Sequence, residues 1–380
     1  MRRDLRLVTA VIEFPHGRNR PVADLSHIAP VTVTPACVPS RACLVQDGGK
    51  ESLMNAFIAR DPDRGPAAAA VNTRRYALGY SQSEFRRLES QGALFRDFTE
   101  DVLRRAGLAQ GMHVLDVGCG VGDVSLLAAD LVGPSGAVLG IDRSKEALDV
   151  ATRRAAAGER SNVRFSATEL EGFSTQYKFD AVIGRLILCY QPDPVAALRR
   201  LLMCLRPGGI VAFQDMVMPF ARSIPDGRQF RLCRQWILDT FERAGVEPEM
   251  GGKLFATFLA AGLPPPQMVA AARVEGSEQS PVYDYLTDVL RSLLPMAERT
   301  GVATAAEVDI DTMAERLRRE AVANDACIML PPLIGAWTQL PSAGLTGSTM
   351  SGRASSSVSH RRSNRPAAAT GINQARAAPR

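Results

Sequence analysis

The sequence predicts an α/β fold in which an open, mostly parallel sheet carries helices on both faces. Short apolar segments alternate with helical segments between about residues 83 and 213, and a glycine-rich turn follows the first apolar segment directly. This alternation is typical of parallel sheets, because parallel strands need crossover connections. The chain has 380 residues, 46% of them hydrophobic and 22% charged, and can therefore bury a substantial core.

The strands of this sheet are expected where apolar runs are bounded by turn residues. The first five are expected at 113–117, 137–141, 163–165, 179–183 and 210–213. Helices with one apolar face are expected at 83–106, 123–131, 144–157 and 194–205. Further on, we expect helical segments within 220–261, a strand at 267–274, helices at 283–294 and 312–323, and a last strand at 327–337. Thr312 and Glu315 have the spacing of a capping box.

The two ends of the chain differ in composition from its middle. The last 40 residues contain six arginines, no acidic residue and few large apolar side chains, so we expect a disordered basic tail over 341–380. Residues 1–72 lack sustained periodicity and are expected to be a poorly ordered extension. The domain between them, 73–340, would carry helical insertions at about 219–262 and 280–325. Its charge is mildly acidic, which argues against a nucleic-acid partner.

The cysteines and the apolar segments indicate the compartment. The seven cysteines are widely scattered, without a CxxC pair, and there are only four histidines. Neither a disulfide framework nor a metal site is therefore expected. No stretch approaches the ~20 consecutive apolar residues that a membrane span needs. We expect a protein of the reducing cytoplasm.

The most informative motif is the turn after the first strand, in which Asp116 is followed by Gly118, Gly120 and Gly122. Glycines permit positive φ in a tight turn and let a ligand lie against the backbone, next to the N–H groups of the following helix. A dinucleotide-binding turn has the pattern G-x-G-x-x-G. Here the third glycine comes one residue early and Asp123 occupies the last position, which disfavours a nicotinamide cofactor.

With this turn and the segments that follow it, the chain resembles the class I S-adenosylmethionine-dependent methyltransferases. The resembling segments, in order, are 114–122, the strand end at Asp142, the stretch 168–170, Phe179-Asp180 with Pro192-Asp193-Pro194, and 205–209. The type 11/12 group, which includes the ubiquinone/menaquinone methyltransferases, is the most similar in character. The resemblance implies a Rossmann-like seven-stranded sheet with an added helical lid.

The same resemblance implies S-adenosyl-L-methionine as the cofactor and assigns its binding residues. Those of the glycine turn are Asp116, Gly118, Cys119, Gly120 and Gly122. Asp142, followed by Arg143, would accept hydrogen bonds from both ribose hydroxyls. Glu169 and Leu170 would lie at the adenine, although many relatives have Gly-Asp-Ala there. Tyr80, in a segment 76–80 with a second tyrosine, would belong to a cover over the cofactor.

Methyl transfer is an in-line displacement, so the protein mainly has to align the reactants and exclude water. Side chains at the ends of the fourth and fifth strands are the natural candidates to face the acceptor. We name three as catalytic candidates: Arg185, as an anchor for an anionic substrate, Tyr190, and Asp215 as a general base.

The sequence predicts an enzyme that methylates a small organic acceptor. Two alternatives stay open: an isoprenoid quinone or lipid as the acceptor of a C- or O-methyltransferase, and a regulatory module that binds S-adenosylmethionine without catalysis. A homodimer is compatible with either.

Overall fold

The structure is a computed structural model that describes residues 78–79 and 82–342. The extension expected over 1–72, Tyr80 and all but two residues of the expected tail lie outside the described residues. The statements below concern the described part of the chain.

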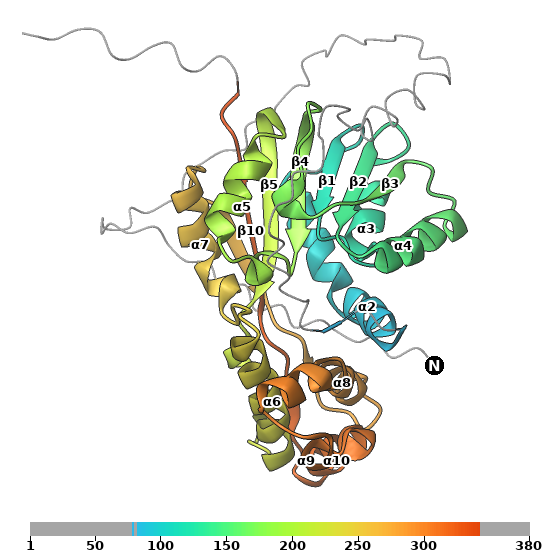
Figure 1. Ribbon diagram of the computed structural model, residues 1–380, viewed down its shortest axis with the longest axis vertical. Helices are drawn as coiled ribbons and strands as arrows, with labels where there is room; N and C mark the ends of the chain where they lie inside the picture. Colours follow the sequence, from blue (N-terminus) through green and yellow to red (C-terminus); the bar gives the residue numbers. More distant parts are fainter. Residues whose placement is uncertain (1–77, 80–81, 343–380) are drawn as a thin grey trace, which may run out of the picture. The chain divides into compact units, whose positions relative to one another are not determined.

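The main sheet has seven strands in the order β3-β2-β1-β4-β5-β10-β7 (Figure 1). The strands are β1 His113–Val117, β2 Ala137–Asp142, β3 Val163–Ala167, β4 Phe179–Arg185, β5 Leu205–Met216, β7 Gln267–Ala271 and β10 Leu333–Gln339. The five strands β1 to β5 pair in parallel, whereas β10 runs antiparallel to both of its neighbours. The predicted Rossmann-like, mostly parallel sheet is confirmed.

Helices cover both faces of this sheet. They are α2 Gln82–Arg105, α3 Asp123–Val132, α4 Lys145–Ala157, α5 Pro194–Leu202 and α7 Met250–Ala261. Neighbouring residues of β10 identify the two sides: a Cβ at Gly335 would meet Val102 of α2, while the Ile334 side chain lies against Gly251 of α7. Because successive side chains of a strand point to opposite faces, α2 and α7 lie on opposite sides of the sheet.

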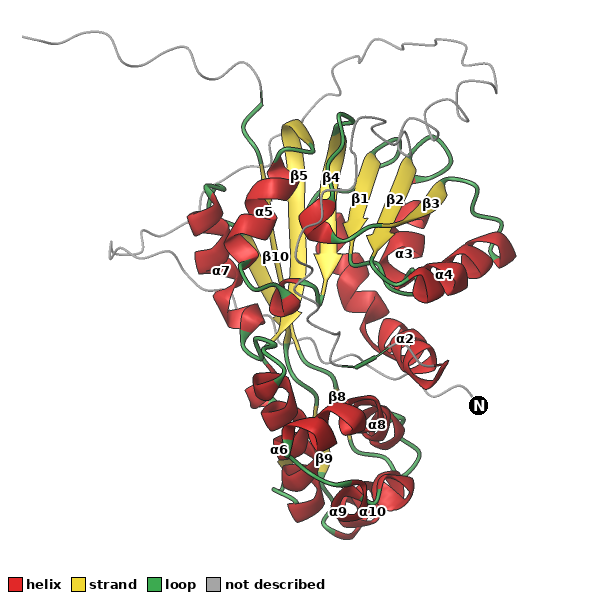
Figure 2. Cartoon of the chain, viewed as in Figure 1, coloured by secondary structure: helices red, strands yellow, loops and turns green. Residues whose placement is uncertain are grey.

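A cap of helices lies beyond the carboxyl ends of the parallel strands (Figure 2). Its helices are α6 Arg228–Arg243, α8 Val282–Thr300, α9 Ala305–Val308 and α10 Ile310–Ala323. A small antiparallel sheet, in the order β6-β9-β8, joins them; its strands are β6 Arg222–Ile224, β8 Val274–Glu275 and β9 Cys327–Met329. Within the described residues, no helix combines the length and the apolar character needed to cross a bilayer.

Three expectations for the second half of the chain differ from the structure. The last strand divides into β9 in the cap and β10 in the main sheet, because Pro331 and Pro332 interrupt the run. Helix α7, expected within an insertion, packs on the main sheet at β5 and β10. The capping box consists of Thr304 and Glu307, so the prediction at Thr312 was wrong. Thr312 instead bonds Asp309 within the first turn of α10.

Gly335 tests the close approach of α2 to the sheet. An added methyl group at this position would lie 2.5 Å from a Val102 Cγ atom, and the stiff valine can relieve such overlap only by shifting. We expect Gly335→Ala to lower the free energy of unfolding by about 1–3 kcal/mol in urea titrations.

Gly252→Ala is the matched control, because Gly252 lies in α7 and a Cβ there meets nothing within 4 Å. This variant should be as stable as the wild type or more stable, by roughly 0.5–1 kcal/mol. Equal stability of the two variants would contradict the packing described here.

Candidate active site

A cavity of about 860 Å³ lies between the carboxyl ends of the parallel strands and the cap. One end is formed by the glycine turn after β1 and by the ends of β2 and β3, with Gly120, Asp142 and Glu169 among its lining residues. The other end is formed by α6, α8 and the segment after β5. In open α/β sheets, ligands bind at this edge, where the strand order reverses.

The glycines of the turn have different roles. Gly118, Gly120 and Gly122 all have positive φ, of 68°, 53° and 88°. At Gly120 an added Cβ would meet nothing closer than Leu88 at 3.8 Å, and the residue lines the cavity, so its backbone is open to a ligand. At Gly122 a Cβ would lie about 3.0 Å from the Cβ of Ala151, so this glycine serves packing.

Asp142 is held against the turn by two backbone donors. Gly120 N–H donates to its Oδ2 and Ser144 N–H to its Oδ1, each at 2.9 Å. Burial raises the pKa of this carboxyl, and the two hydrogen bonds oppose the shift. Because each carboxylate oxygen has two lone pairs, one acceptor site per oxygen remains for hydroxyl groups of a ligand in the cavity.

Asp116 and Cys119, two further residues predicted at the cofactor, are buried and do not line the cavity. Ser125 Oγ donates to Asp116 Oδ2 at 2.5 Å, and burial raises the pKa of Asp116 to about 7. The Cys119 thiol points toward Gly140 of β2. The structure therefore gives both residues a place behind the turn, and direct contact with a ligand remains a prediction without support from these side chains.

The predicted adenine end is built from loops. Arg143, Glu169 and Leu170 all line the cavity, the last as the first residue of the 3-10 helix η1 Leu170–Gly172. Glu169 is exposed, whereas Leu170 is buried. Their common location agrees with the predicted grouping. Of the tyrosine segment, only Leu78 and Gly79 are described, and Leu78 lines the cavity.

Two of the three catalytic candidates line the cavity. Arg185 ends β4 and donates from Nη1 to Thr99 Oγ1 of α2 at 3.0 Å. Tyr190 ends the 3-10 helix η2 Leu188–Tyr190. The residue after Arg185, Leu186, has a positive φ of 56°, an uncommon conformation for leucine that turns the chain sharply at the cavity wall.

Asp215, the third candidate, is fully buried and does not line the cavity. Its neighbour Gln214 faces α2, where it accepts from Thr99 Oγ1 at 3.1 Å, so Asp215 points to the opposite face of the sheet. There the Cys189 thiol and the η2 backbone lie beside the carboxyl, although neither oxygen makes a hydrogen bond of ordinary geometry within the described residues. Burial raises the pKa of Asp215 to about 7.

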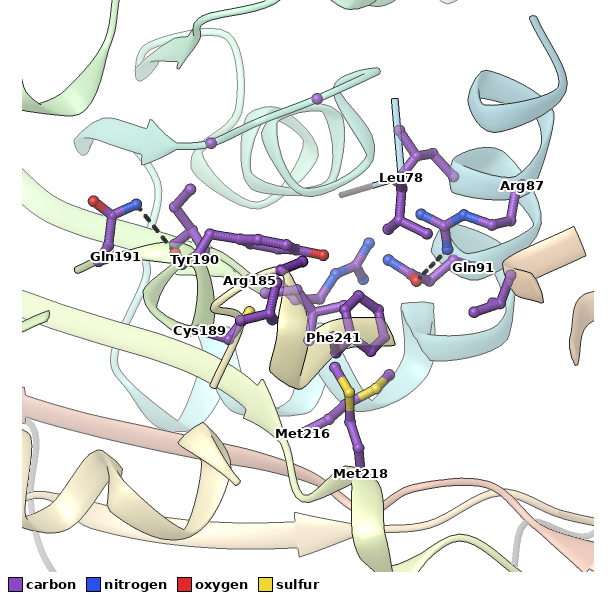
Figure 3. A pocket seen from close by; sticks show the side chains of 18 of the residues that line it. Leu78, Arg87, Gln91, Arg185, Cys189, Tyr190, Gln191, Met216, Met218 and Phe241 are labelled. Atoms are coloured by element: carbon purple, nitrogen blue, oxygen red, sulfur yellow. Dashed lines mark hydrogen bonds between the residues drawn. The ribbon is translucent and has the colours of Figure 1, made fainter. Parts of the chain in front are cut away.

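A buried polar cluster on α2 and α8 was missed by the sequence reasoning. Arg87 forms a bidentate ion pair with Glu84, with both distances 2.7 Å. Gln91 Oε1 accepts from Arg87 Nη1 at 2.8 Å and from Tyr285 OH at 3.2 Å, so its amide nitrogen remains as a donor. Figure 3 shows Gln91 and Arg185 extending into the same part of the cavity. The only signal in the sequence was the spacing of Glu84, Arg87 and Gln91, which lie along one side of an otherwise apolar face of α2.

The buried carboxyl of Asp215 predicts a pH dependence of stability. Its pKa is higher in the folded than in the unfolded state, so the folded state binds the proton more tightly. Its contribution to stability is thus largest below pH ~4 and is lost as the pH rises toward about 7. Asp215→Asn removes this titration. Relative to wild type, its free energy of unfolding should rise between pH 4 and 8, by up to about 4 kcal/mol.

Denaturant titrations between pH 4 and 8 measure the free energy of unfolding of both proteins. Asp149→Asn, at an exposed position of α4, is the control. Parallel curves for wild type and Asp215→Asn would show that the carboxyl is not perturbed.

Comparison with known proteins gives a match over the part of the chain that contains the glycine turn. Residues 108–241 match a family model described as a methyltransferase domain. A demethylmenaquinone methyltransferase of Geobacillus sp. (strain WCH70) is 38% identical over 65 residues, which are 17% of this chain and 28% of that enzyme. The aklanonic acid methyltransferase of Streptomyces sp. (strain C5) is 36% identical over 90 residues, covering 23% of this chain and 40% of that enzyme.

Among solved structures, a SAM dependent methyltransferase from Aquifex aeolicus is 25% identical and has a TM-score of 0.33, covering 36% of this chain and 73% of that one. The chain thus spans less than a third of the demethylmenaquinone methyltransferase and under half of the aklanonic acid enzyme. The segment that matches the family model, residues 108–241, contains the glycine turn and strands β1 to β5. Residues 108–241 therefore form a methyltransferase domain, and its ordered motifs and strand order agree with the resemblance to the class I S-adenosylmethionine-dependent methyltransferases.

Proposed function

We propose that this protein is an enzyme that transfers a methyl group from S-adenosylmethionine to a small organic acceptor by in-line displacement. The observation that carries the proposal is the pairing of Gly120 with Asp142 at one end of a cavity whose other end is apolar. When bound, the cofactor supplies an activated methyl group on a sulfonium that leaves without charge. The protein's own task is then alignment and the exclusion of water.

The cofactor end fits a nucleoside. The open backbone at Gly120 lets a ligand approach the turn, and Asp142 is already oriented by two N–H donors. We assign Asp142 to the ribose hydroxyls, and Glu169 and Leu170 to the base. Asp116 and Cys119 would act through the shape of the turn, since their side chains do not line the cavity.

The acceptor end fits an organic molecule held mainly by apolar contact. Met216, Met218 and Phe241 line it, next to Tyr190 and Arg185 (Figure 3). Tyr190 and Arg185, which lies at the border between the two ends, are proposed to orient the reactants. An acceptor hydroxyl or acidic C–H needs a base. Asp215 does not line the cavity but lies behind Cys189, which does, so we assign Asp215 a positioning role.

The demethylmenaquinone methyltransferases among the relatives favour a second candidate acceptor, an isoprenoid quinone or similar lipid. Transfer of labelled methyl groups from the cofactor into fractionated cell extract separates the possibilities. A labelled small molecule supports the proposal and a labelled quinone the second candidate. Cofactor binding without any labelled product would indicate a regulatory module.

The compartment and the oligomeric state are also part of the proposal. The five cysteines within the described residues are all free thiols, which suits a reducing cytoplasm. A homodimer is proposed as well, and light scattering of the purified protein decides between it and a monomer.

Gly120→Val tests the open backbone at the cofactor end. The branched side chain would project into the cavity, and we expect binding of S-adenosylhomocysteine to be lost in calorimetry. The control is Gly262→Val, which places the same side chain at another positive φ, of 89°, in open space at the end of α7. Both variants carry the backbone strain, but only Gly120→Val should lose binding. Normal binding by Gly120→Val would refute the assignment.

Asp142→Ala tests the carboxylate at the ribose. We expect cofactor affinity to weaken by about 1.5–3 kcal/mol, the typical cost of losing charged hydrogen bonds. Asp149→Ala, an exposed carboxylate of the neighbouring helix α4, should leave the affinity unchanged. Equal affinities of both variants in calorimetry would contradict the proposed contact.

A further inference from the structure

The cavity has an uneven distribution of charge. Its lining carboxylates, Asp142, Glu169 and Glu171, all lie at the cofactor end, after β2 and β3. Of its lining arginines, Arg185 lies at the border between the two ends, and Arg234 lies in the part formed by the cap. No acidic side chain lines that part within the described residues. The acceptor end is therefore apolar with a positive charge.

Arg234 is the single charged residue on the cavity face of α6. The α6 residues that line the cavity have helical spacing and form one face: Phe230, Cys233, Arg234, Ile237, Leu238 and Phe241. Arg234 is half-buried, with its Nε atom fully buried, and a guanidinium in such a face loses part of its hydration unless its charge is compensated. The position of Arg234 on the cavity face of α6 therefore requires an explanation.

The contacts of Arg234 fix its position without neutralising it. Nη1 donates to the carbonyl oxygens of Pro219 and Ala221, at 3.2 and 3.1 Å. Nε is buried without a hydrogen-bond partner, and no carboxylate lies within 4 Å of the guanidinium in the part of the chain that the structure describes. Backbone carbonyls satisfy N–H groups but carry no net charge. The Nη2 edge remains for an acceptor of hydrogen bonds.

Arg185 differs in its surroundings. It ends β4 beside Gly184, which pairs with Val117 immediately before the glycine turn, so it lies next to the cofactor end. Asp123 and Asp116 attract its charge at longer range. S-adenosylmethionine contributes one carboxylate, which can compensate one guanidinium at most. Neither Arg185 nor Arg234 forms an ion pair within the described residues, and of these two Arg234, on the cap helix α6, is the one left for the acceptor.

We infer that the acceptor is an apolar organic carboxylate and that Arg234 binds its anionic group. This inference rests on the proposed function and names the substrate class of the same cavity. The apolar body of the acceptor would pack on Phe230, Ile237 and Phe241, with its carboxylate at the Nη2 edge. The fixed position of the guanidinium then selects acceptors by charge as well as by size.

The experiment measures binding of two matched pairs of probes to the full chain by calorimetry, with and without saturating S-adenosylhomocysteine. The pairs are 2-naphthoate with 2-naphthamide and decanoate with decanamide, so each pair differs mainly in charge. In the wild type, at least one carboxylate should bind roughly ten- to hundred-fold more tightly than its amide. Arg234→Met should abolish this preference and leave the affinities for the amides and for S-adenosylhomocysteine unchanged.

Two further variants make the result specific. Arg234→Lys keeps the charge and should retain part of the preference, and Arg228→Met, at an exposed position of the same helix, should retain all of it. No preference in the wild type for either pair, or a preference that survives Arg234→Met, overturns the inference. Loss of the preference in Arg185→Met with retention in Arg234→Met also overturns it.

A different result would contradict the proposed function and not the role of Arg234. If S-adenosylhomocysteine does not bind to the wild type, the proposed cofactor is wrong, whatever the probes show. The probe measurements without S-adenosylhomocysteine still decide whether Arg234 binds a carboxylate.

Discussion

The hydrogen bond between the Gly120 backbone and the Asp142 carboxylate is the interaction on which the site depends. It joins the ends of β1 and β2, and Ser144 holds the other carboxylate oxygen. Burial of Asp142 disfavours its charged form, and the two N–H donors offset that cost. A carboxylate oriented in this way before a ligand arrives loses little freedom on binding, which is the advantage of a preformed site.

The cap converts a crevice at the edge of the sheet into a cavity. Helix α6 contributes one face that is apolar except for Arg234, and α8 adds Tyr285, Leu286 and Val289. The Gln91–Tyr285 hydrogen bond connects α2, on the sheet, with α8, in the cap. Within α2, Arg87 is paired with Glu84 and donates to the same Gln91 oxygen. Because this polar cluster is buried and satisfied, it fixes where the cap helix lies over the strand ends.

The alternation of side chains along β5 separates two neighbouring residues. Gln214 belongs to the hydrogen-bonded row that includes Thr99 and Arg185, whereas Asp215 lies on the other face against Cys189. The position of Asp215 at the end of a central strand made it a plausible acceptor contact. A strand turns adjacent side chains to opposite faces, however, so Gln214 faces α2, and Asp215 is buried behind Cys189, which itself lines the cavity.

The sequence by itself determined the alternating strands and helices of the first half, the glycine turn and Asp142 at the end of its strand, because these features depend on local periodicity and backbone conformation. It could not divide the run at 327–337 between two sheets, nor could it find Gln91, Tyr285 or Arg234. Those positions depend on contacts between segments far apart in the chain. Only the tertiary structure decides which side chains share a cavity, since that depends on how helices α2, α6 and α8 pack over the sheet edge.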